Sequence, residues 1–98
     1  MYIVFLRFSD NQVQASKYMA GHKQWLQTGF DSGIFLLAGS IHPHSGGLVL
    51  AHNIAEEDLI DVVNNDPFVT ENVVKAEIVR IDPTKSDSRL AFILDSEN

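Results

Sequence analysis

The chain of 98 residues contains no cysteine, which excludes disulfide scaffolds, thiol nucleophiles and cysteine-rich zinc sites. Positive charge is also scarce. Seven Lys and Arg residues stand against 13 Asp and Glu residues, so that the formal net charge is −6, and no basic cluster occurs. We therefore expect neither a nucleic acid nor an anionic membrane as partner.

Long apolar runs and targeting signals are missing as well. No apolar segment approaches the roughly 20 residues that a membrane helix needs, and the apolar start lacks the basic region and cleavage site of a signal peptide. A cytoplasmic location is therefore expected. The composition is 45% hydrophobic and 20% charged, which is typical of a globular protein, and the length favours one domain.

The hydrophobic pattern predicts the order β-α-β-β-α-β. Almost continuous apolar segments indicate strands, whereas apolar residues at i, i+3, i+4 and i+7 indicate the first helix. Ser9 and Gln12 resemble a capping box at the start of that helix. The predicted strands cover 2–8, 34–41, 47–54 and 73–81, and the predicted helices extend from the Ser9 cap to Phe30 and over 56–65.

This order predicts an α+β, ferredoxin-like fold over residues 1–83, followed by a tail at 84–98. The four-stranded antiparallel sheet should have the order 4-1-3-2, with both helices on one face. The first three strands are apolar on both alternating sets, so the second face needs a cover. We expect a homodimer that packs sheet to sheet, with the tail on the partner; the alternative cover is the chain's own tail, through Leu90, Phe92 and Ile93.

Three of the four histidines lie near the two ends of the third predicted strand. His42 and His44 lie in the hairpin loop before it, whereas His52 is carried away by a strand of about 20 Å. A metal site built from these three is therefore nearly excluded, and we expect neither a metal nor a cofactor. His42 and His44 either belong to an exposed polar loop or contact a substrate.

His22 lies within the apolar stripe of the first helix, where a buried imidazole needs partners for its ring nitrogens. It is either a hydrogen-bonded core histidine or part of a site. The preceding Gly21 costs about 1 kcal/mol in a helix relative to alanine. A segment that approaches the helix closely at this point would explain it.

Asp66 stands in the stretch "NNDPFV". Aspartate before proline is a favoured start of a helix, so Asp66 is explained as an N-cap without any chemistry. If its carboxylate also meets His22, it would orient the ring, fix the tautomer and favour the imidazolium. His22 could then shuttle a proton. Ser40 and Ser45 are candidate nucleophiles by proximity only.

Three short motifs occur in a characteristic order along the chain. They are His22, Trp25 and Leu26, then Gly33, Leu36, Ala38 and Gly39, and finally Asp66, Pro67 and Phe68. In these motifs the chain resembles the YCII-related (YciI-like) proteins of the dimeric α/β-barrel superfamily. The resemblance covers residues 1 to about 83 and implies a homodimer of two ferredoxin-like sheets with a His22–Asp66 site. Related superfamily members isomerise, eliminate from or oxygenate small cyclic or aromatic compounds.

Three hypotheses follow. The first is a small-molecule enzyme, a lyase or isomerase, in which Asp66 orients His22 as general acid/base for a cyclic or aromatic compound. The second is a non-catalytic homodimer that binds a small ligand in the same cleft. The third is an assembly partner without a site. The substrate contacts expected for the first are Ser40, His42, His44 and Phe68.

Overall fold

The strands and the two longest helices follow one another in the predicted order β-α-β-β-α-β. The computed structural model describes residues 1–96. Its strands are β1 (Tyr2–Phe8), β2 (Phe35–Ile41), β3 (Gly46–Ala51) and β4 (Val74–Arg80). Its α-helices are α1 (Ala15–Asp31), α2 (Glu56–Asn64), α3 (Pro67–Thr70) and α4 (Ala91–Ser96), and short 3-10 turns η1 (Gln12–Gln14) and η2 (Ser88–Leu90) precede α1 and α4.

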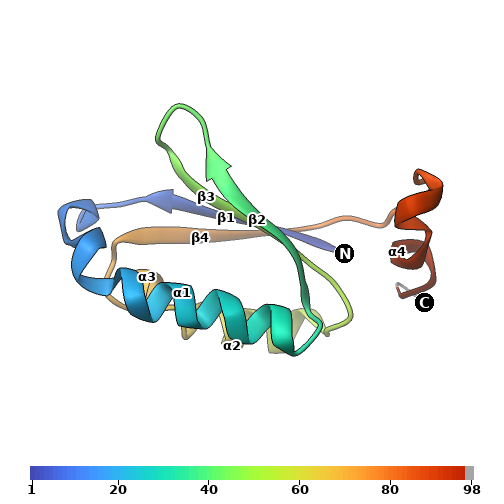
Figure 1. Cartoon of the computed structure of the whole chain (residues 1–98), viewed down its shortest axis with the longest axis horizontal. Coiled ribbons are helices and arrows are strands. Elements are labelled where there is room, and N and C mark those ends of the chain that lie inside the picture. Colours follow the sequence, from blue (N-terminus) through green and yellow to red (C-terminus); the bar gives the residue numbers. More distant parts are fainter. Residues whose placement is uncertain (97–98) are drawn as a thin grey trace.

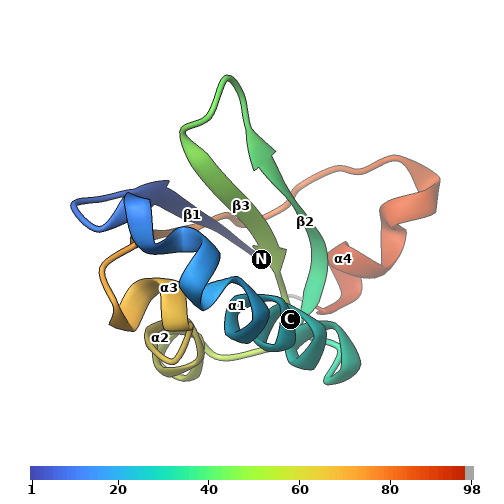
Figure 2. The same ribbon diagram turned by 60° about the vertical axis from the view of Figure 1, so that its left-hand side comes forward.

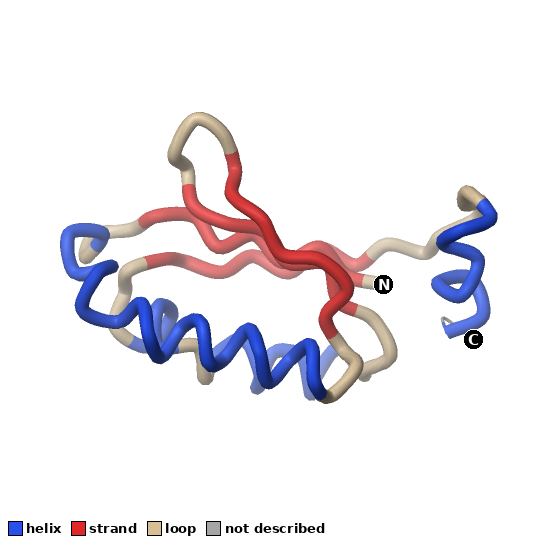
Figure 3. Tube along the Cα trace, viewed as in Figure 1, coloured by secondary structure: helices blue, strands red, loops and turns tan. Residues whose placement is uncertain are grey.

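The four strands form one antiparallel sheet in the order β2-β3-β1-β4. This is the predicted order 4-1-3-2 read from the opposite edge, so the ferredoxin-like fold is confirmed. Figure 1 and Figure 3 show that α1, α2 and α3 cover one face of the sheet. The same views place α4 beyond the ends of the strands, at the far end of the tail.

The predicted capping box before α1 is wrong. The Gln12 N–H donates to the main-chain oxygen of Ser9 at 3.2 Å, which forms a turn, and α1 begins only after η1. The side chain of Ser9 contacts the Asn72 side chain at 3.4 Å instead of capping a helix. The third strand is also shorter than predicted, because Asn53 adopts a left-handed backbone conformation with φ 58° and the chain leaves the sheet after Ala51.

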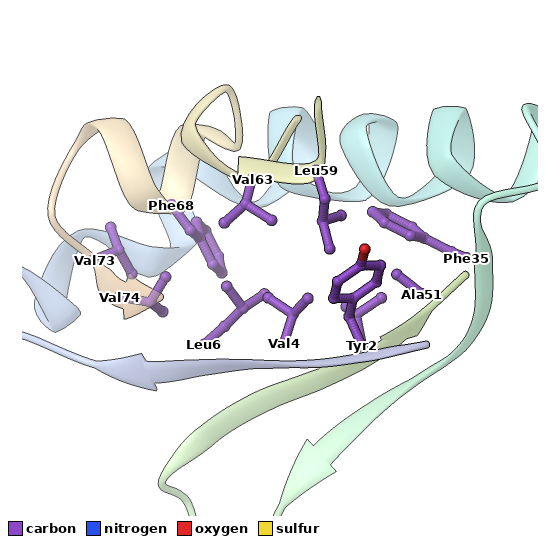
Figure 4. Packing of buried hydrophobic residues seen from close by; sticks show 11 residues of the cluster. Tyr2, Val4, Leu6, Phe35, Ala51, Leu59, Val63, Phe68, Val73 and Val74 are labelled. Carbon is purple, nitrogen blue, oxygen red and sulfur yellow. The ribbon is translucent and has the colours of Figure 1, made fainter. Parts of the chain in front are cut away.

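The core fills the space between the helices and one face of the sheet. Figure 4 shows Leu59 and Val63 of α2 and Phe68 of α3 pointing toward the side chains of β1. Leu59 is fully buried, and burial of each such side chain contributes about 1.5–3 kcal/mol. The buried cluster comprises Tyr2, Val4, Leu6, Phe35, Val49, Ala51, Leu59, Val63, Phe68, Val73 and Val74.

Two glycines allow close packing around this core. A Cβ at Gly29 of α1 would collide with the ring of Phe35, so the end of the helix packs directly on β2. Gly46 begins β3 with φ 124°, and a Cβ there would collide with the main-chain oxygen of Leu6. Neither position accepts a side chain without movement of its neighbour.

The face of the sheet opposite the helices is apolar and lacks a cover among residues 1–96. Strand alternation and pairing place Ile3, Phe5, Leu48 and Leu50 on this face, all partly exposed, together with Leu37, which is 52% exposed. The tail does not lie over it: Phe92 meets the ring of His52 edge to face, with 5.9 Å between the ring centroids.

The described part of the tail has one buried hydrophobic residue, Ile93, while Leu90 and Phe92 stay 47% and 46% exposed. The last two residues of the predicted tail, 97–98, lie outside the described part of the chain. No helix within residues 1–96 is long and apolar enough to cross a membrane.

Candidate active site

Asp66 is the N-cap of α3, as its position before proline predicts. Its backbone is extended, with φ −63° and ψ 124°, and Pro67 is the first residue of the helix. One carboxylate oxygen, Oδ1, accepts the Phe68 N–H at 3.0 Å. The side chain is fully buried, so this N-cap is a carboxylate in the interior of the protein.

The same oxygen meets His22. The distance from His22 Nδ1 to Asp66 Oδ1 is 2.9 Å, and 14% of the histidine side chain is exposed. Gly21 explains this approach, because a Cβ on it would lie 3.0 Å from Cγ of Pro67. The glycine next to the histidine thus lets the proline next to the aspartate come close to α1, as expected from the sequence.

Among residues 1–96, His22 is the one side chain that forms a hydrogen bond with the Asp66 carboxylate. Its second oxygen, Oδ2, is buried and has no hydrogen-bond partner among residues 1–96. A buried carboxylate that lacks donors is costly, so His22 Nδ1 and the Phe68 N–H are the groups that compensate it. We therefore expect the two side chains to act as one unit.

Aromatic rings fix the plane of the imidazole. Phe68 stacks on His22 with 4.1 Å between the ring centroids and 4° between the planes. Trp25 lies one helical turn away, at 5.8 Å and 24°. The indole N–H of Trp25 donates to the main-chain oxygen of Val62 at 2.8 Å, which ties this ring to α2. The histidine therefore has little freedom to rotate.

A cavity of about 330 Å³ opens beside the imidazole, between α1 and the sheet. Ligand pockets fall mostly between about 300 and 1,000 Å³ and are largely apolar, and this cavity meets both criteria. Because Asp66 holds Nδ1, Nε2 is the ring nitrogen left for a ligand. The cavity is lined by Leu6, Phe8, Met19, His22, Lys23, Leu26, Ala38, Gly39, Ser40, Gly46, Gly47, Leu48, Val49, Phe68 and Val74.

The register of the sheet explains which of its residues line the cavity. Gly47 of β3 pairs with Leu6 on one side and with Ser40 on the other. Leu6 is buried beneath the helices, and paired residues share a face, so Gly47 and Ser40 also face the helices. Gly47 contributes no side chain here, which leaves room for the cavity.

The structure brings together four of the predicted site residues and separates the others. His22, Ser40 and Phe68 line the cavity, and Asp66 holds His22 from behind. The turn with His42 and His44 does not line it, because the β2–β3 hairpin rises away from the helices (Figure 2).

Ser45 is also absent from the lining, since its main-chain oxygen accepts the Phe8 N–H at 3.0 Å and holds it in the hairpin. Three lining residues of α1, Met19, Lys23 and Leu26, are missing from the predicted site. Met19 and Leu26 lie at i−3 and i+4 from His22, and Lys23 lies at i+4 from Met19, so helical spacing was the available signal. Within residues 1–96 no three His, Asp or Glu side chains gather as a metal site would require.

The fold is similar to that of 5-chloro-2-hydroxyhydroquinone dehydrochlorinase (TftG) from Burkholderia phenoliruptrix AC1100, solved in complex with 2,5-dihydroxybenzoquinone. The TM-score is 0.63 at 17% sequence identity, over 83% of this chain and 93% of that chain. The two chains therefore share the ferredoxin-like fold described above. No protein-family model and no curated protein sequence matches it, so the YCII-related resemblance stays a prediction.

Proposed function

We propose that the protein is a small-molecule enzyme in which His22 acts as general acid/base and Asp66 orients it. The observation that carries this proposal is the 2.9 Å contact between His22 Nδ1 and Asp66 Oδ1 at the wall of a cavity. A neutral imidazole held in this way carries its proton on Nδ1. Nε2 then has a free lone pair, which can accept a proton from a bound compound.

The carboxylate also stabilises the product of that step. When Nε2 takes a proton, the ring becomes a cation 2.9 Å from the fully buried Asp66 oxygen. Opposite charges attract, so the carboxylate offsets part of the free-energy cost of forming this cation during proton transfer. The stacked ring of Phe68 adds a favourable contact between a cation and a π-face.

Size and lining favour a cyclic or aromatic substrate. The cavity of about 330 Å³ is walled mainly by aliphatic and aromatic side chains, which suits a ring with a few polar substituents. The structurally similar dehydrochlorinase acts on a chlorinated hydroxyhydroquinone and was solved with a dihydroxybenzoquinone. A hydroxylated or quinonoid ring is therefore the first class to test.

The chemistry fits a lyase or an isomerase. In an elimination, Nε2 takes a proton from a ring carbon, the C–H electron pair forms a double bond, and the leaving group departs with its bonding pair. In an isomerisation, His22 returns the proton to a different carbon. Both reactions need a group that takes a proton from carbon, and positioned histidines contribute about 10²–10⁴-fold to such steps.

The test is exchange of substrate hydrogen for deuterium in D₂O, together with turnover, on a panel of hydroxylated and chlorinated hydroquinones and quinones. We expect His22→Gln and Asp66→Asn to lower both rates by about 10²–10⁴-fold. Asparagine is as good an N-cap as aspartate, so the Asp66→Asn variant should keep its fold. His52→Gln, which changes a histidine outside the cavity lining, is the control and should match the wild type.

Undiminished turnover of a confirmed substrate by both variants would overturn the proposal. Binding of the panel without exchange or turnover would instead favour the second candidate, a non-catalytic ligand-binding protein. The stacked and capped arrangement of the pair is compatible with that role. His42→Gln and His44→Gln test the remaining predicted substrate contacts in the hairpin.

The proposed working form is a homodimer joined by the uncovered sheet face. Its support is the apolar character of that face and the exposure of Leu37. The exposed tail residues Leu90 and Phe92 would then contact the partner. Light scattering after size exclusion should give the mass of two chains, and Leu37→Asp should give one. Ile60→Asp on the outside of α2 is the control; a monomeric wild type would contradict the dimer.

A further inference from the structure

The wall of the cavity carries one full positive charge. Lys23 follows His22 on α1 and is the one Lys or Arg among the described lining residues, which include no Asp or Glu. The buried Asp66 carboxylate behind His22 is bound to His22 Nδ1 and to the Phe68 N–H, and not to Lys23. Lys23 is thus a cationic side chain at the cavity wall that no carboxylate neutralises by direct contact.

Lys23 also differs from the arginines of the chain in having no carboxylate beside it. Within residues 1–96 each of the three arginines contacts an acidic side chain, whereas Lys23 forms no ion pair or side-chain hydrogen bond. Its charge is thus available to a bound molecule. The arginine pairs are Arg7–Glu77, Arg80–Asp82 and Arg89–Asp87.

The rest of the wall is suited to the body of such a molecule. Phe8, Leu26 and Phe68 contribute apolar surface, and Ser40 adds one hydroxyl. From this combination we propose that Lys23 selects cyclic or aromatic compounds that carry a negatively charged oxygen. The inference deepens the function proposed above. It rests on that proposal because it requires the cavity to be a ligand site.

The placement of Lys23 and His22 gives the bound molecule a direction. Successive residues on an α-helix point about 100° apart, so the two side chains line different parts of one wall. A ring whose anionic oxygen lies at Lys23 would present another of its atoms to Nε2 of His22. Lys23 is therefore a specificity-determining residue, and His22 is the group that exchanges the proton.

The experiment compares charged and neutral ligands of the same shape by calorimetry. The probes are benzoate with benzamide, and 4-nitrophenolate with 4-nitroanisole. We expect the wild type to bind at least one anion about fivefold more tightly than its neutral analogue, because an ion pair at a partly exposed site makes a modest contribution to affinity. The preference should shrink in about 1 M salt, where charges are screened.

Lys23→Gln should abolish this preference and leave the affinity for the neutral probes unchanged, whereas Lys23→Arg should restore it. Lys17→Gln is the matched control, because Lys17 lies on the same helix over the ring of Tyr18 and outside the cavity lining. A preference for benzoate alone identifies a carboxylate ligand, and one for 4-nitrophenolate alone a phenolate; either supports the inference.

A wild type that binds neutral and charged probes equally, or a Lys23→Gln variant that keeps the preference, would overturn the inference. A different result would overturn the acid–base proposal. If Lys23→Gln removes the anion preference while His22→Gln leaves turnover intact, Lys23 keeps its role and His22 loses the one assigned to it.

Discussion

The two halves of helix α1 meet the sheet in different ways. In the C-terminal half, Gly29 packs so closely on Phe35 that no Cβ fits between them. In the N-terminal half, a cavity of about 330 Å³ lies between the sheet and the side chains of His22 and Lys23. The close half holds the helix in place, so the open half can present polar side chains at fixed positions without filling the space beside them.

The largest expected effect comes from disturbing the close half. Gly29→Ala forces the buried ring of Phe35 to move, and overpacking of this kind costs about 1–3 kcal/mol, more than the helix propensity gained. Thermal denaturation should therefore show a lower midpoint. A midpoint raised by the substitution would mean that the two elements are not in such close contact.

Filling the open half should affect binding more than folding. Ser40→Leu places a larger side chain on the cavity side of β2, at a position that is exposed, and we expect at least about tenfold weaker binding of the probe ligands, equal to about 1.4 kcal/mol. Ser16→Leu is the matched control, because Ser16 is exposed on α1 and does not line the cavity. Equal loss of affinity in both variants would contradict the placement of the ligand.

The smallest effect is expected at Gly21, where α1 contacts α3 beside the His22–Asp66 pair. Gly21→Ala places a Cβ about 3.0 Å from Pro67, so α3 must shift by a few tenths of an ångström. The gain in helix propensity, about 1 kcal/mol, should offset much of that strain. We therefore predict nearly unchanged stability but a weaker Nδ1–Oδ1 hydrogen bond, measured as an upfield shift of the His22 Nδ1 proton. An unchanged proton shift would show that Gly21 does not set this distance.

The predictable part of the fold is the part that depends on local pattern and chain order. Apolar runs identified the strands, and Asp66 before Pro67 identified the start of α3, because both signals act over a few residues. The Ser9 capping box failed because the Gln12 N–H found a main-chain acceptor. The end of β3 was missed because a left-handed Asn53 leaves little trace in a sequence.

The candidate site also has one part that could be predicted from the sequence and one part that could not. Its central pair could be predicted, since His22 is polar within an apolar stripe and topology, together with the resemblance, pointed to Asp66. The cavity could not, because its volume depends on how far the β2–β3 hairpin bends from α1 (Figure 2). That bend removes His42 and His44 from the lining and leaves Lys23 on it, although the sequence alone does not distinguish these three polar residues.

The most direct test of the acid–base role is the tautomer of His22, measured by long-range ¹H–¹⁵N correlation with and without 2,5-dihydroxybenzoquinone. We predict a neutral ring with its proton on Nδ1, and an Nε2 resonance that shifts when the ligand enters the cavity. Asp66→Asn should weaken this tautomeric preference. A proton on Nε2 in the free protein, with a resonance that no ligand of the panel moves, would contradict the assignment of His22 as the proton-transferring group.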